Sequence, residues 1–141
     1  MSAPAFDVAG TIARVRARVM EEVARQPAQP HATVRADAGQ WQLLAPGVER
    51  KLLWERGGAT SCMVRLAPGA SFPAHGHPID EETVILEGSL WIGPTLLLRA
   101  GDFHVGRSGM QHEEVRTDEG CVCFLRTASS FFEPAAGAPA G

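Results

Sequence analysis

The stretch GASFPAHGHPIDEETVILEG (residues 69–88) places two histidines one residue apart and follows them with three consecutive carboxylates. Residues two apart in a strand share a face, so His75 and His77 are expected to point to the same side. After a bend over residues 78–80, Glu81 can return a carboxylate to that side. Neighbouring imidazoles repel when protonated, and a bound divalent cation would account for their pairing. The stretch therefore predicts a metal site.

A fourth candidate ligand lies in GDFHVGRSGMQHEE (residues 101–114), where His112 follows the turn RSG. Three imidazoles and one carboxylate, with room for water or substrate, make an open transition-metal site. Such a ligand set accepts zinc, iron, manganese, nickel or copper, so the identity of the metal stays open. His104 is expected either to line the cavity or to support His112 from outside the ligand set.

The chain around these residues alternates apolar and polar side chains in short runs separated by Gly and Pro. Strands are expected at residues 32–36, 48–55, 60–66, 83–86, 88–93, 95–99, 102–106 and 121–127. Short strands at this spacing indicate a β-sandwich or a barrel.

The first part of the chain has helical spacing instead. In residues 11–26 an apolar stripe recurs at steps of three, four and four, through Ile12, Val15, Val19 and Val23. We therefore predict a helix and linker over residues 1–31 and a barrel over residues 32–132. A disordered tail is expected over residues 133–141 because this segment is rich in Ala, Gly and Pro.

The two histidine-bearing stretches resemble the paired motifs of the cupin superfamily. In the first motif the matching positions are Gly69, His75, His77, Glu81 and Gly88, and in the second they are Gly101, Gly109 and His112. The second motif departs at Arg107 and Arg116, which replace the usual proline and asparagine. The resemblance implies an all-β double-stranded β-helix, a jelly-roll barrel, here preceded by one N-terminal α-helix.

A closer resemblance, over residues 33–127, is to the cupin half of ChrR-type zinc anti-sigma factors. The segments that carry it are WQLLAPGVERKLL (41–53), VRLAPGASFPAHGHP (64–78) and GCVCFLRT (120–127). In that family the counterparts of His75, His77, Glu81 and His112 hold the metal, which makes one zinc ion the first choice here. The usual HPGGEE is HPIDEE in this chain, so Glu82 remains an alternative to Glu81.

The sigma-binding part of that family is not expected in this chain. ChrR-type proteins hold the sigma factor with a separate helical zinc domain that has its own His and Cys ligands. Here no cysteine precedes Cys62, and His31 is the one histidine before His75. Sigma-factor binding is therefore not supported by this sequence.

Composition narrows the remaining function classes. The net charge of −3 implies no general attraction to nucleic acid, and no apolar run approaches membrane-spanning length. Three scattered cysteines favour buried thiols over a disulfide framework, so we expect a cytoplasmic protein. The uncovered helix stripe and the edge strands of a small barrel favour a homodimer.

Two functions remain. The first is a binding or regulatory module in which the metal captures a small ligand or reacts with an oxidant. The second is a metal-dependent enzyme of the cupin class, a dioxygenase or isomerase acting on a small oxygenated substrate. Glu82 and Glu113 adjoin predicted ligands but are expected on the opposite strand face, so no catalytic residue is assigned. We favour the first function.

Overall fold

The computed structural model describes residues 13–18, 21 and 30–132. The chain divides into two compact units, Met1–Thr33 and Val34–Gly141. In the first unit, the described residues 13–18 and 21 are helical. Val15 is exposed, and the other three members of the predicted stripe lie outside the described residues. The predicted tail over residues 133–141 also lies outside them, and the predicted domain limits stay a prediction.

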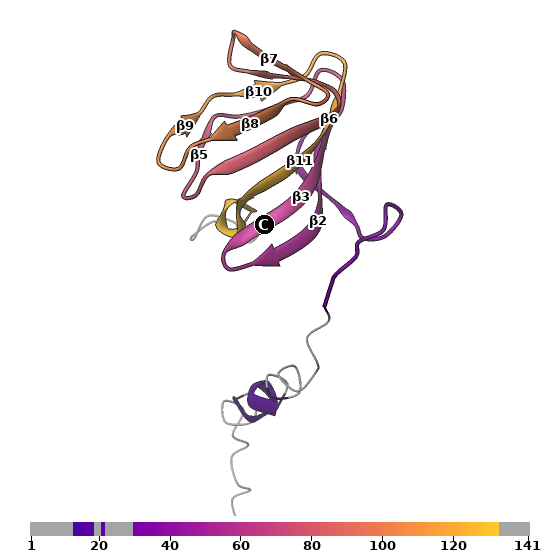
Figure 1. The fold of residues 1–141 in the computed structure, drawn as a ribbon, viewed down its shortest axis with the longest axis vertical. Helices are drawn as coiled ribbons and strands as arrows, with labels where there is room; N and C mark the ends of the chain where they lie inside the picture. Colours follow the sequence, from indigo (N-terminus) through magenta and orange to yellow (C-terminus); the bar gives the residue numbers. More distant parts are fainter. Residues whose placement is uncertain (1–12, 19–20, 22–29, 133–141) are drawn as a thin grey trace, which may run out of the picture. The chain divides into compact units, whose positions relative to one another are not determined.

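The second unit is built of short strands that curl into a nearly closed barrel (Figure 1). The strands are β1 (Trp41–Ala45), β2 (Val48–Arg56), β3 (Ala59–Leu66), β4 (Ser71–Phe72), β5 (His75–Gly76), β6 (Glu81–Ile92), β7 (Leu96–Arg99), β8 (Phe103–Gly106), β9 (Gln111–His112), β10 (Val115–Arg116) and β11 (Cys121–Ala128), and a 3-10 helix η1 (Ser129–Phe132) follows. The all-β jelly-roll class predicted from the sequence is confirmed.

The sheet order explains how distant segments meet. The main path runs β1-β2-β3-β11-β6-β10-β4, β7 and β8 also pair with β6, and β5 pairs with β9 in a separate two-stranded sheet. The C-terminal strand β11 thus lies between β3 and β6, with antiparallel neighbours on both sides. Non-local pairing of this kind cannot be deduced from the alternation within any one strand.

The core lies on the concave side of this sheet. Its buried apolar residues are Val48, Cys62, Val64, Leu66, Ile85, Leu90, Leu98, Cys121 and Cys123. All three cysteines are buried and free, as expected for thiols that act as small apolar side chains.

Two expected strands, 83–86 and 88–93, are one continuous strand, β6. The expected break at residue 87 lies beside a β-bulge, since the register against β11 passes from Glu87 opposite Val122 to Ile85 opposite Cys123 and skips Leu86. Gly88 has a φ of 70°, and a Cβ there would overlap the backbone of Gly120. Only glycine fits this close approach with a positive φ, so Gly88 carries β6 past the bulge to Ile92.

The expected strand at residues 32–36 was wrong. The backbone there pairs with no strand, and two of its carbonyl groups instead accept hydrogen bonds from the ammonium group of Lys51. Lys51 Nζ donates to the carbonyl oxygens of Arg35 and Ala36 at 2.9 and 2.8 Å. Strand β1, by contrast, forms over Trp41–Ala45, where no strand had been expected.

Candidate metal centre

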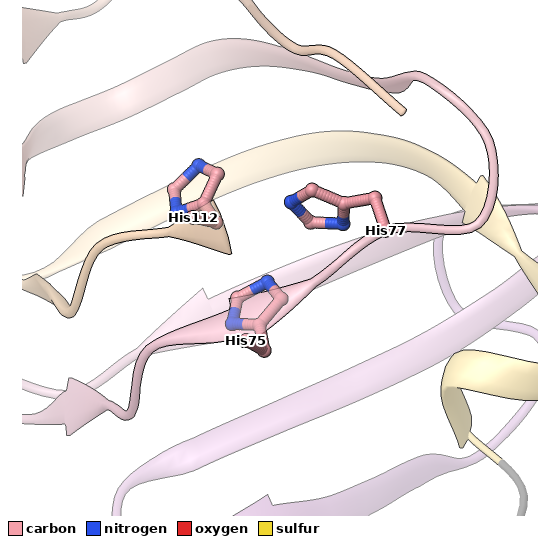
Figure 2. Close-up of side chains that lie close together, drawn as sticks. All are labelled: His75, His77 and His112. Atoms are coloured by element: carbon pink, nitrogen blue, oxygen red, sulfur yellow. The ribbon is translucent and has the colours of Figure 1, made fainter. Parts of the chain in front are cut away.

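Three imidazoles from two distant segments meet at one end of the barrel. His75 lies on β5 and His112 on β9, and these residues are direct partners in the two-stranded sheet. His77 follows β5, and one nitrogen atom from each of the three residues lies within 4.8 Å of the others. Figure 2 shows the three rings gathered around one space, as shared ligands of one ion would be.

Hydrogen bonds between the two loops fix this meeting. The amide of Gly109 donates to the carbonyl of His77 at 2.9 Å, and the amide of Ser108 donates to Asp80 Oδ1 at 2.8 Å. The turn that delivers His112 also closes with Arg107 in the place of the usual proline, since the Met110 amide reaches its carbonyl at 3.2 Å. The departure at Arg107 therefore leaves the turn intact.

Glu81 is the carboxylate beside the imidazoles. Its Oε2 lies 3.3 Å from His77 Nδ1, and its Oε1 lies 3.8 Å from His75 Nε2. Glu81 is 5% exposed. Glu82 points to the other face of β6, where its Oε2 lies 3.7 Å from Arg126. The geometry thus brings together the four predicted ligand side chains and leaves the alternative carboxylate outside.

The ring nitrogens of two histidines are already oriented. His75 Nδ1 lies 2.8 Å from the carbonyl of Pro73, and His112 Nδ1 lies 2.9 Å from the carbonyl of Glu113. A carbonyl can only accept, so each Nδ1 carries the proton and each Nε2 keeps its lone pair. Metal-binding histidines usually donate their other ring N–H to a carbonyl or carboxylate in this way, which fixes the tautomer and the ring orientation.

Unpartnered polar atoms mark the same place. Buried atoms that have no hydrogen-bond partner include His75 Nε2, both ring nitrogens of His77 and Glu81 Oε2. Buried polar groups are nearly always paired, and leaving these atoms on three neighbouring side chains unpartnered would cost several kcal/mol in total, although one ion could take just one of the two His77 nitrogens. A cation bound among them would satisfy lone pairs that the protein itself leaves unused, so the residues fit a metal.

The pKa shifts of Glu81 and His77 agree with such an ion. Burial tends to raise the pKa of Glu81, but His75 and His77 outweigh it and hold that pKa below its usual range. Burial also lowers the pKa of His77, and the other imidazoles add to this effect. For His75, burial is outweighed by Glu81 and the Pro73 carbonyl, which raise its pKa. An ionised carboxylate and neutral imidazoles are the forms that bind metal, so the shifts of Glu81 and His77 favour binding, whereas at His75 metal binding competes with protonation.

Two further residues adjoin the imidazoles. His104 on β8 lies with its ring 5.6 Å from that of His112, which places it beside the site rather than among the three grouped histidines. Gly106, also on β8, faces the rings closely, because a Cβ there would lie 3.0 Å from His112 and 3.2 Å from His77 Nε2. Sequence reasoning missed Gly106, whose only local signal was a glycine inside a strand.

A cavity opens beside the imidazoles. His75, Glu81 and His112 line one part of it, and apolar side chains from β2, β3, β6, β10 and β11 line most of the rest. Other titratable groups are few, since Cys123 is the one remaining such side chain on its wall. Glu113 lies against Gly93 in an outer depression, away from this cavity.

Comparison with known proteins places the chain among the cupins. Residues 29–130 match the family described as the ChrR Cupin-like domain. The chain is 26% identical over 140 residues to the anti-sigma-E factor ChrR of Cereibacter sphaeroides, an alignment that covers 89% of this chain. It spans 65% of the length of that relative.

Solved structures agree on the fold. The complex of Rhodobacter sphaeroides SigE with the anti-sigma factor ChrR matches with a TM-score of 0.58 and 26% identity, over 89% of this chain and 70% of that one. An acetylacetone dioxygenase from Acinetobacter johnsonii matches with a TM-score of 0.62 and 13% identity, over 74% and 76% of the two chains. The second likeness shows the fold alone.

Proposed function

Because the chain belongs to the ChrR cupin-like domain family, we propose that it is a mononuclear metal-binding module with a regulatory role. In this proposal His75, His77, Glu81 and His112 hold one divalent transition metal ion, with zinc the first choice. The metal takes up a small ligand or reacts with an oxidant, and the barrel's contacts with a partner change in response.

The observation that carries the proposal is the convergence of unpartnered ligand atoms. One nitrogen from each of three histidines lies within 4.8 Å of the others, and the buried carboxylate of Glu81 adjoins two of the rings. These four side chains would fill a tetrahedral site, so a ligand-responsive site needs the ion to expand to five or more ligands.

A regulatory role is favoured over an enzymatic one by the chemistry of the cavity wall. A metal-dependent dioxygenase or isomerase usually needs a further acid or base near the metal. Glu82 points away from the cavity and Glu113 lies outside it, and His104, whose ring lies 5.6 Å from that of His112, is not among the residues that line it. Among the described lining residues, the proposed ligands themselves supply the carboxylate and the imidazoles.

The partner of the module stays open. The curated relative is an anti-sigma factor, and the solved structure that matches shows such a factor bound to SigE. Our expectation that this sequence does not support sigma-factor binding stays a prediction. Within the described residues, no helix is long and apolar enough to cross a membrane.

Elemental analysis tests the metal proposal directly. Protein purified without a His tag or chelator is expected to carry about one divalent transition metal ion per chain. A content near zero that persists after reconstitution with zinc, iron and manganese would contradict it. Oxygen-consumption assays with small diketones and thiols then separate the two functions, because sustained turnover would favour the enzyme.

A further inference from the structure

The cavity beside the proposed metal ligands is apolar and small. Its walls away from the imidazoles include Leu90, Ile92, Val115 and Leu125. The volume open to the centres of water molecules is about 60 Å³, several times what one water requires. A compact organic molecule therefore fits beside the metal ligands, whereas a bulky one does not.

An aromatic side chain from the C-terminal turn covers this cavity. Phe131, on η1, has its ring centroid 4.7 Å from that of His75 and 6.5 Å from that of His77. It also lies 5.9 Å from the ring of Phe72 on β4, and Phe72 in turn meets His75 edge-on at 5.4 Å. Both phenylalanines line the cavity, so they shield the imidazole of His75 on its apolar side.

The turn that carries Phe131 is fastened to the β2–β3 hairpin. The Ser129 amide donates to the carbonyl of Gly58 at 2.9 Å, and the hydroxyl groups of Ser129 and Thr60 lie 2.8 Å apart. Gly57 and Gly58 both have positive φ, as a tight two-residue hairpin turn requires. Phe131 thus has a defined position over the cavity.

The charge of the site indicates the kind of ligand. One divalent cation with three neutral imidazoles and one carboxylate keeps a net charge of about +1 inside apolar walls. A buried net charge is costly unless it is paired. An anionic oxygen donor added as a fifth ligand would neutralise the site, and the apolar walls would receive the carbon atoms behind that oxygen.

We propose that the cavity binds a small organic anion such as a short-chain carboxylate, with its oxygen on the metal and its carbon chain beneath Phe72 and Phe131. Phe131 sets the size of ligand that the cavity admits. The inference rests on the proposed metal site, and it adds to that proposal a ligand class and a specificity-determining residue.

Titration of the cobalt-loaded protein tests this inference, because visible absorption of cobalt reports changes in its coordination. The probes are acetate, butyrate, benzoate and neutral n-butanol. Each buried methylene contributes about fourfold in affinity, so butyrate, which has two more than acetate, is expected to bind roughly 15-fold more tightly. Benzoate should bind poorly because Phe131 blocks its ring, and n-butanol should leave the spectrum unchanged.

The variant Phe131→Ala should admit benzoate and reduce the preference for butyrate over acetate to below about threefold, because the cover is lost. Phe131→Leu should keep most of the preference because it preserves an apolar cover. Leu43→Ala, which removes an exposed apolar side chain from β1, should match the wild type. Cobalt content, measured for each variant, separates a changed cavity from a lost metal.

The outcomes are distinct. A wild-type protein that takes up no cobalt overturns both the metal site and this inference. Cobalt uptake with equal affinities for acetate and butyrate, or with an equal response to n-butanol, overturns the ligand class alone. Identical benzoate binding in the wild type and Phe131→Ala overturns the role of Phe131 alone. The wild-type titrations decide the ligand class even if Phe131→Ala fails to fold.

Discussion

Strands β6 and β11 present two faces of unlike character, although the same short stretches supply both. On the inner face, Glu81 adjoins the imidazoles and Ile85 and Cys123 lie in the core. On the outer face, the neighbouring residue Glu82 pairs loosely with Arg126. Adjacent residues in a strand face opposite sides, so a shift by one residue would exchange the two surroundings.

The outer face also carries an apolar row in direct cross-strand register. It runs from Met63 through Phe124 and Val84 to Phe103. Phe103 is 59% exposed in the single chain, and Leu86 and Val105 are also exposed. The inner face therefore buries its apolar side chains around polar ligands, whereas the outer face leaves an apolar row that a second molecule could cover.

The largest expected effect is on the inner face. His77→Ala and His112→Ala are each expected to weaken metal affinity by more than about 100-fold. Removing a residue that only hydrogen-bonds to a metal ligand costs about 10–100-fold in affinity, and removing the ligand itself should cost more. Elemental analysis after dialysis checks this. His31→Ala is the control, since His31 is exposed. A loss of metal in this control as large as in the ligand variants would contradict the assignment.

The adjacent glutamates give a matched test of the two faces. Glu81→Gln is expected to weaken metal binding by at least ~10-fold. Glu82→Gln should change it less than about fivefold, because an exposed ion pair contributes up to ~1 kcal/mol. Competition with a metal-chelating dye measures both constants. The reverse order would mean that β6 runs with its faces exchanged at the site.

The outer row predicts a homodimer, in which the N-terminal segment also helps to close the interface. Phe103→Ser should weaken dimerisation by roughly tenfold or more, because burying a phenylalanine contributes about 1.5–3 kcal/mol. Light scattering at micromolar concentration measures the mass, which should be twice the 15.0 kDa of one chain.

Two controls sharpen the dimer prediction. Met110→Ser removes an exposed apolar side chain outside the row and should leave the mass unchanged. Deleting residues 1–30 should weaken the dimer. An unchanged dimer would show that the N-terminal segment does not contribute to dimerisation. A wild-type mass near 15.0 kDa would contradict the homodimer itself.

The smallest effect is expected at the outer ion pair. Arg126→Ala should lower the free energy of unfolding by less than ~1 kcal/mol, because Arg126 and Glu82 are both about half exposed at the side chain. Urea denaturation at low protein concentration measures it. A loss above ~2 kcal/mol would show that the outer face is buried even when the protein is dilute.

The sequence by itself determined which side chains share a face. The spacing of His75 and His77 and the return of Glu81 after a bend are local, so period-two alternation was enough to predict them. The alternating runs between Gly and Pro likewise predicted most strands and the β-rich class. These inferences hold because the pleat of a strand fixes to which face each side chain points over a few residues, whatever packs against the strand.

Only the tertiary structure decided what each face meets. His112 reaches His75 through the pairing of β5 with β9, and Phe131 reaches the cavity because η1 fastens to the hairpin turn after β2. The close fit of Gly106 against two imidazoles and the capture of residues 35 and 36 by Lys51 were equally invisible in local patterns. The alternation of apolar and polar residues shows to which face of a strand each side chain points, but not which residues it contacts. Those contacts are selected by packing between segments that are distant along the chain.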